Sequence, residues 1–148
     1  MTNTLTEQLW QTVETAFEDS NIDHPITIYR GGDPYHPLYP NTPMAHIVLD
    51  NIPEDEMPPP GEYSNFDIGY NIGERHFYIA HIHLLHQHRG GTTSRRLIGI
   101  AEIVAKELGF NTVKVDSIHN PIFLIRLLDL GYTARIKNSG LYQCEKPI

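Results

Sequence analysis

The residues that could do chemistry gather in one short turn, His88-Arg89-Gly90-Gly91-Thr92-Thr93-Ser94. We expect an apolar strand before this turn and a helix after it. The first backbone N–H groups of a helix have no partner inside the helix, so a helix N-terminus is a ready site for anions. The two glycines let the backbone approach a ligand closely, and the hydroxyl groups that follow add donors. The turn therefore predicts an anion-binding site.

Three positive charges lie in or beside this turn. Arg89 precedes the glycines, and Arg95 and Arg96 fall in the first turn of the expected helix. The helix dipole disfavours a cation at that end by a few tenths to about 1 kcal/mol. A bound polyanion such as a pyrophosphate would relieve the conflict, whereas pairing with surface carboxylates is the alternative. Together the turn and the arginines favour the anion site.

Histidines crowd the strand that leads into the turn. His81 and His83 lie two residues apart on one face, with His76, His86 and His88 nearby. Zinc accepts histidine ligands at such spacing, although a third ligand is not evident. Alternatively, one imidazole could deprotonate an amine, since an unperturbed pKa near 6.5 suits a base. The third interpretation is that these are ordinary half-buried strand residues.

Hydrophobic periodicity predicts one α/β domain over all 148 residues. Helices are expected at residues 5–18, 95–108 and 121–130. Strands are expected at residues 26–29, 44–50, 65–72, 76–85, 112–118, 132–136 and 141–145. Proline-rich loops at 34–43 and 53–61 cannot be central strands, because proline donates no ladder hydrogen bond. We read both loops as excursions at one end of a sheet.

Composition excludes several classes of protein. The formal net charge of −7 argues against general nucleic-acid binding, which needs a basic surface. No apolar run approaches the roughly 20 residues of a membrane span. The first residues lack the basic and apolar regions of a signal peptide. Cys144 is the only cysteine, so no intrachain disulfide can form, and we expect a reducing, cytoplasmic compartment.

Residues 78–145 resemble the GNAT family of acetyl-CoA-dependent N-acetyltransferases. The family's pyrophosphate loop reads Gln/Arg-x-x-Gly-x-Gly/Ala, and the stretch that begins at Arg89 occupies this pattern. Thr92 and Ser94 replace the two signature glycines. Asn120 and the pair Gly131-Tyr132 match the spacing of an Asn and a terminal Gly-Phe/Tyr in the family's last helix.

The resemblance implies a mostly antiparallel sheet that splays into a V-shaped slot, with helices on both faces. The strand before the loop would pair with the pantetheine of acetyl-CoA, the co-substrate, and loop amides would hold its pyrophosphate. Asn120 would lie near the pantetheine arm. The cofactor-binding residues expected in this way are Leu84, Leu85, Arg89, Gly90, Gly91, Thr92, Thr93, Ser94, Arg95 and Asn120.

The implied reaction acetylates an amine and needs a base and an acid. The family often carries its base on the strand of His81 and His83, so either imidazole could serve. Many members use a tyrosine seven residues after the Asn as the acid. Here that position is Leu127, which cannot donate a proton. Tyr132 or Tyr142 could replace it, and we take Tyr142 as the candidate.

Two alternatives to an acetyltransferase stay open. A non-catalytic protein on the same fold, structural or binding, is favoured by Leu127, by the altered glycines and by proline-rich loops that could contact a protein partner. The stretch 120–131 also resembles small acetyltransferase-like proteins of tailed bacteriophages, some of them virion components, which would place the chain in a virion. A histidine-based metal protein is the third possibility. The acceptor and the oligomeric state are left open.

Overall fold

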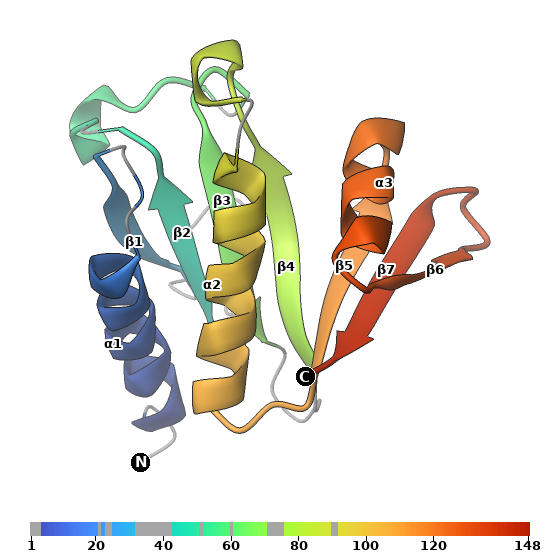
Figure 1. Ribbon diagram of the computed structural model, residues 1–148. Coiled ribbons are helices and arrows are strands. Elements are labelled where there is room, and N and C mark those ends of the chain that lie inside the picture. The colour runs from blue at the N-terminus through green and yellow to red at the C-terminus, as the bar shows by residue number, and fades with distance from the viewer. Residues whose placement is uncertain are drawn as a thin grey trace.

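The computed structural model describes residues 4–20, 22, 25–31, 43–50, 52–59, 61–70, 76–89 and 92–148. In this part of the chain the strands form a seven-stranded sheet in the order β1-β2-β3-β4-β5-β7-β6 (Figure 1). Neighbouring strands run antiparallel, except that β4 and β5 are parallel. The expected α/β fold with a mostly antiparallel sheet is therefore confirmed.

The helices and strands follow the predicted order, with ends that differ by a few residues. The α-helices are α1 (Thr4–Asp19), α2 (Thr93–Glu107) and α3 (Pro121–Asp129). The strands are β1 (Thr27–Gly31), β2 (Met44–Val48), β3 (Asn65–Tyr70), β4 (His76–His83), β5 (Thr112–Ile118), β6 (Thr133–Ile136) and β7 (Tyr142–Pro147). Two short 3-10 helices, η1 (Glu54–Glu56) and η2 (His86–His88), were not expected. The first proline-rich loop, apart from Pro43, and the turn at 73–75 lie outside the described residues.

Local sequence explains where α3 begins and where α2 and α3 end. The side chain of Asn120 accepts a hydrogen bond from the backbone N–H of Ile122 at 2.9 Å, and proline follows at the first helical position. Gly109 and Gly131 adopt φ values of 87° and 94° just past the ends of α2 and α3. Glycine tolerates this left-handed conformation, which closes a helix C-terminus.

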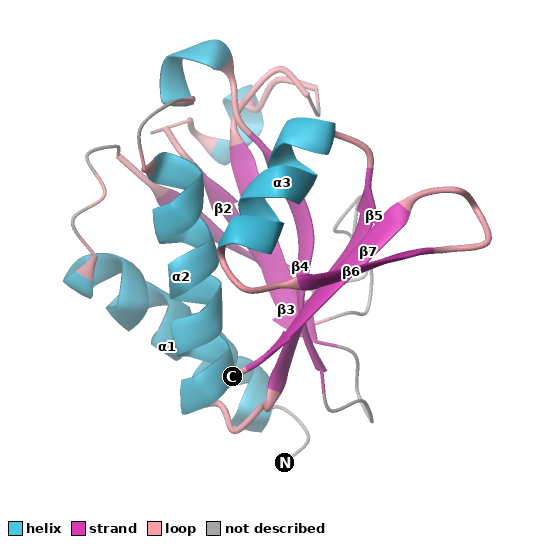
Figure 2. Cartoon of the chain, turned by 45° about the vertical axis from the view of Figure 1, so that its right-hand side comes forward, coloured by secondary structure: helices cyan, strands magenta, loops and turns pink. Residues whose placement is uncertain are grey.

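One apolar core joins the described α-helices to a single face of the sheet. Leu9 of α1, Leu97 of α2 and Leu127 of α3 belong to the same buried cluster as Phe66 of β3 and Phe77 of β4. Figure 2 shows α2 and α3 in front of the strands. The expected acetyltransferase-like packing of helices against the sheet is present, and the α-helices of the described part of the chain lie together on one side of it.

The opposite face of β2, β3 and β4 carries a row of polar side chains. In the strand register His46, Asp67 and His81 stand side by side, one from each strand. Met44 and Val48 flank His46 on the same face of β2, and all three side chains are buried.

The paired part of β4 and β5 is short. Their ladder runs from His76–Thr112 to Ile79–Val115, yet β4 continues to His83 and β5 to Ile118 without further pairing. Ala80 is an extra residue in β4, because Ile79 and His81 pair with consecutive residues of β3. Such a bulge bends a strand. Beyond Ile79 the two strands diverge, as Figure 1 shows, so the expected V-shaped opening is present.

Two glycine substitutions test this packing in opposite directions. A Cβ at Gly69 would collide with the backbone oxygen of Pro43, so Gly69→Ala should destabilise the fold by about 1–3 kcal/mol. A Cβ at Gly99, inside α2, would meet nothing within 4 Å, so Gly99→Ala should stabilise it by about 0.5–1 kcal/mol. Urea denaturation of both variants measures the two changes. Equal stabilities would contradict the close approach of β2 and β3.

Candidate active site

A pocket of about 410 Å³ occupies the opening between β4 and β5. Residues 79–84 of β4 and the following loop form one wall. The other wall runs from β5 to the start of α3 and includes Val115, Asp116, Ile118, His119 and Asn120. Arg89 and Ser94 lie at the end of the pocket beside α2, and α3 adds Ile122, Phe123 and Arg126. Strands, loop and helices thus meet at the point where the sheet splays.

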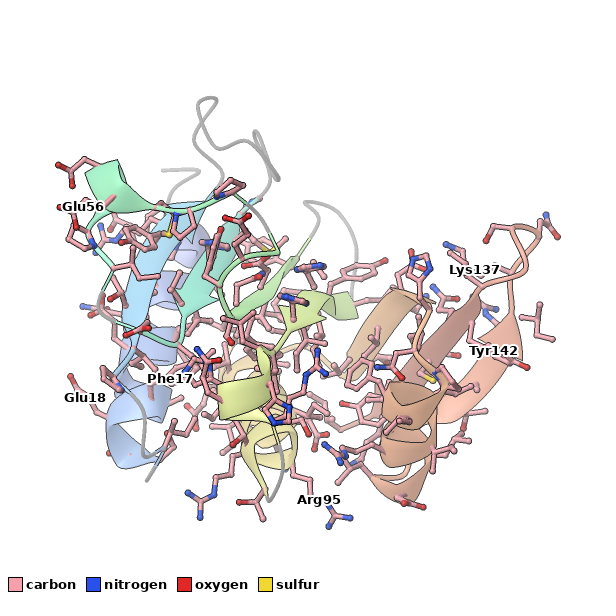
Figure 3. The ribbon with its side chains drawn as sticks, turned by 90° about the horizontal axis from the view of Figure 1, so that it is seen from above. Phe17, Glu18, Glu56, Arg95, Lys137 and Tyr142 are labelled. Carbon is pink, nitrogen blue, oxygen red and sulfur yellow. The ribbon has the colours of Figure 1, made fainter. Side chains whose placement is uncertain are left out.

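The pocket brings together part of the predicted site. The predicted residues that line it are His81, His83, Leu84, Arg89, Ser94 and Asn120. The predicted residues outside its lining are Leu85, Thr92, Thr93, Arg95 and Tyr142. Figure 3 shows Arg95 at the outer edge of α2 and Tyr142 on β7, both away from the opening. Gly90 and Gly91 lie outside the described residues. The roles of all these residues stay predictions.

The N-terminus of α2 reaches one end of this pocket through Ser94. The first hydrogen bond of the helix runs from Arg96 N–H to the oxygen of Thr92 at 2.9 Å, so the preceding N–H groups have no partner within the helix. The side chain of Thr92 makes no capping bond. This arrangement favours an anion at Ser94, which is buried and lines the pocket.

Two guanidinium groups flank this helix end. Arg89 Nε donates to the backbone oxygen of Leu84 at 2.6 Å. Arg126 Nη1 donates to the hydroxyl oxygen of Ser94, which ties α3 to the first turn of α2. Both arginines line the pocket, so a polyanion there would meet two positive charges besides the helix amides.

Sequence reasoning missed Arg126. A signal existed, because Arg126 is the only charged residue in the apolar run from Ile122 to Leu128. A lone cation in such a helix is costly unless it reaches a partner, and here that partner is Ser94 across the pocket.

His83 stands on the face of β4 that looks away from the core. Its Nε2 lies 2.9 Å from the backbone oxygen of Gly61. A carbonyl oxygen only accepts, so Nε2 carries the proton and Nδ1 carries the lone pair. His83 is thereby held as a proton acceptor through Nδ1.

His81 stacks beside His83, with ring centroids 6.5 Å apart, and contacts a different set of partners. Its Nδ1 lies 2.9 Å from Asn65 Nδ2 and 3.9 Å from Asp67 Oδ2. Burial lowers the pKa of the half-exposed His81 ring, and the negative charge of Asp67 partly offsets this. Sequence reasoning also missed Asp67, although a charged residue between Phe66 and Ile68 inside a strand is unusual.

The expected positions for an acid do not reach the pocket. Leu127 is fully buried in the core, and neither Leu127 nor Tyr132 is part of the pocket lining. The hydroxyl of Tyr132 donates to Glu102 Oε2 at 2.9 Å, and burial together with Glu102 raises the pKa of Tyr132 far above its usual value. Tyr132 is therefore unsuited to proton exchange near neutral pH.

The described residues form neither a cluster of metal ligands nor a membrane-spanning helix. Among them, no group of three or more His, Cys, Asp or Glu side chains is placed to hold a metal ion. None of the helices in this part of the chain is long and apolar enough to cross a membrane.

The chain is similar to solved structures, although the sequence comparisons found no match. No protein family and no curated protein matches the chain in sequence. In structure, the chain is similar to a candidate acyl-CoA N-acyltransferase of Klebsiella pneumoniae, with a TM-score of 0.60 and 18% identity over 84% of this chain and 97% of that one.

Two further acetyltransferases share the architecture. Nourseothricin acetyltransferase has a TM-score of 0.52 and 17% identity over 84% of each chain. The PaiA N-acetyltransferase of Thermoplasma acidophilum, solved with coenzyme A, has a TM-score of 0.53 and 11% identity over 71% of this chain and 61% of that one. The chain therefore has the GNAT acetyltransferase fold, as the resemblance implied.

The pKa of His81 provides a test of this electrostatic picture. By NMR titration of the imidazole signals we expect a pKa below 6.5, and Asp67→Asn should lower it further because Asp67 favours the charged ring. Because the pKa of His81 is lower in the folded protein than in the unfolded chain, the unfolded chain binds the proton more readily. Through His81, the protein should therefore become less stable as the pH falls below about 6.5. A pKa that rises in Asp67→Asn would contradict the contact between these side chains.

Proposed function

We propose that the protein is an acyl-CoA-dependent N-acetyltransferase that moves an acetyl group from acetyl-CoA to an amine. One observation carries the proposal: a single pocket joins an anion-binding helix end to two histidines. Arg89, Arg126 and the N-terminus of α2 lie at one end, and His81 and His83 line the wall of β4. The acetyltransferase fold supports the same conclusion.

The pocket walls suit the parts of acetyl-CoA. In the described part of the chain, β4 forms no ladder pair with β5 beyond Ile79, so its backbone can pair with the amides of a pantetheine arm, as an added strand would. The pyrophosphate would lie against the N-terminus of α2, between Arg89 and Arg126. Ile118, Ile122 and Phe123 provide apolar contacts for the rest of the arm.

His83 is our candidate for the base. Its Nδ1 lone pair takes one proton from the ammonium group of the acceptor, and the amine nitrogen then attacks the thioester carbon. The C–N bond forms, the C–S bond breaks, and the second amine proton ends on the sulfur. The net charge of −7 favours a cationic acceptor.

A binding protein without catalysis is the second candidate. The burial of Leu127 at the position of the family's acid favours it. Loss of that acid does not affect the anion end of the pocket, so such a protein would still bind coenzyme A. Binding and turnover must therefore be measured separately.

Calorimetry with acetyl-CoA tests the cofactor site. Arg126→Met and Arg89→Ala should each weaken binding by about 10- to 100-fold, since a hydrogen bond to a charged group contributes about 1.5–3 kcal/mol. Arg135→Ala, which removes an equal charge on β6, should leave the affinity unchanged. Pantetheine, which lacks the phosphates, should bind all variants alike. No binding at millimolar acetyl-CoA would overturn the proposed function.

A turnover assay tests the base. With acetyl-CoA and a panel of primary amines, His83→Ala should lower kcat by about 10²- to 10⁴-fold, the range for loss of a general base. The affinity for acetyl-CoA should stay the same, because the proposal assigns His83 to the acceptor amine and the arginines to the pyrophosphate. His86→Ala, at an exposed histidine outside the pocket, is the matched control. Equal activity of the His83 and His86 variants would exclude His83 as the base.

A further inference from the structure

Behind the pocket wall lies a buried polar row that the proposed reaction does not use. We infer that Asp67, acting through Asn65, holds His81 as a hydrogen-bond donor towards the pocket rather than as a base. Asp67 is fully buried on β3, and Asn65, two residues earlier on the same strand, is almost fully buried. Both face the same side of the sheet as His81, which pairs with Asp67 in the register.

The carboxylate decides which way the Asn65 amide points. Asn65 Nδ2 lies 3.1 Å from Asp67 Oδ2. A carboxylate has acceptor atoms only, so the Asp67 carboxylate must face the NH₂ group of the amide. If the amide oxygen faced the carboxylate instead, two acceptor atoms would repel each other. The amide is therefore held with its nitrogen towards Asp67.

The amide in turn decides where His81 carries its proton. The same Nδ2 lies 2.9 Å from His81 Nδ1. An amide nitrogen only donates, so Nδ1 must accept and the ring proton stays on Nε2. Burial lowers the pKa of His81 and so keeps the ring neutral at pH 7. The nitrogen left for the pocket is then an N–H donor.

The other end of the row holds Asp67 in place. His46 Nδ1 contacts Asp67 Oδ1, and His46 Nε2 lies 3.1 Å from the hydroxyl oxygen of Tyr63. His46, Asn65 and Tyr63 are all buried, so the carboxylate has partners on both oxygens and cannot turn. His46 donates to Asp67 through Nδ1, because a carboxylate only accepts.

Both histidines of β4 therefore carry the proton on Nε2, yet one leaves a hydrogen-bond acceptor free and the other leaves a donor free. His83 uses Nε2 to hold Gly61 and leaves a lone pair, whereas His81 uses Nδ1 to hold Asn65 and leaves an N–H. On the proposed function, the His81 N–H binds the thioester oxygen as that oxygen becomes negative. The neutral ring keeps its proton throughout, so Asp67 and Asn65 are positioning residues and the proton balance is unchanged.

The tautomer can be measured without any substrate. Side-chain ¹⁵N NMR of the ligand-free protein should show His81 with the proton on Nε2. The swap variant N65D/D67N keeps size and net charge but puts a carboxylate beside His81 Nδ1, so the proton should move to Nδ1. A wild-type proton on Nδ1, or no change in the swap variant, would overturn the inference even if the protein binds acetyl-CoA and turns over.

Substitutions at His81, whose side chain is half exposed, avoid the risk that the buried swap variant fails to fold. His81→Ala should lower kcat about 10²- to 10³-fold with little change in the KM for acetyl-CoA, as for loss of one oxyanion donor. His81→Gln, which retains an N–H donor but is no base, should recover part of that loss. Equal losses in both variants would contradict the donor role. Absence of acetyl-CoA binding would remove the proposed function and still leave the NMR result to decide the tautomer.

Discussion

The divergence of β4 from β5 after the Ile79–Val115 pair is the constraint on which the rest depends. Two parallel strands that stayed paired would bury their backbone groups in a continuous sheet and leave no opening. The extra residue Ala80 bends β4, and the β4–β5 ladder ends at the preceding residue, Ile79. The opening exposes one strand edge, lets α2 direct its N-terminus into it, and brings α3 with Arg126 to its side.

The two faces of the sheet beside this opening differ in character: one packs against the helices, and the other carries the polar row. Apolar side chains of β2, β3 and β4 face the helices and stabilise the fold, with Phe66 and Phe77 at the centre. The other face carries the row of His46, Asp67 and His81, where a buried carboxylate is compensated by hydrogen bonds instead of by a lysine or arginine. Such a group destabilises the protein unless its hydrogen-bond partners are in place.

The acetyltransferase fold persists in this chain at 11–18% identity to solved structures. That is possible because the fold depends on the apolar pattern, the helix ends and one bulge, none of which needs particular residues at the site. The site itself departs from the family. By the resemblance, Leu127 stands where many members carry an acid, and here it is a core side chain. On our proposal, the histidines of β4 offer one acceptor and one donor to the same pocket.

The sequence by itself determined the order of elements, because periodicity, the Asn120-Pro121 start and the glycines after α2 and α3 act locally. It also indicated the anion site, since a strand, a turn and a helix N-terminus are contiguous. Only the tertiary structure decided that the described helices share one face, that Arg126 reaches Ser94, and that Asp67 stands behind His81. Asp67 and His81 are 14 positions apart in the sequence, and Ser94 and Arg126 are 32 apart. Which residues meet over such separations depends on strand register and on the splay of the sheet, which no local pattern specifies.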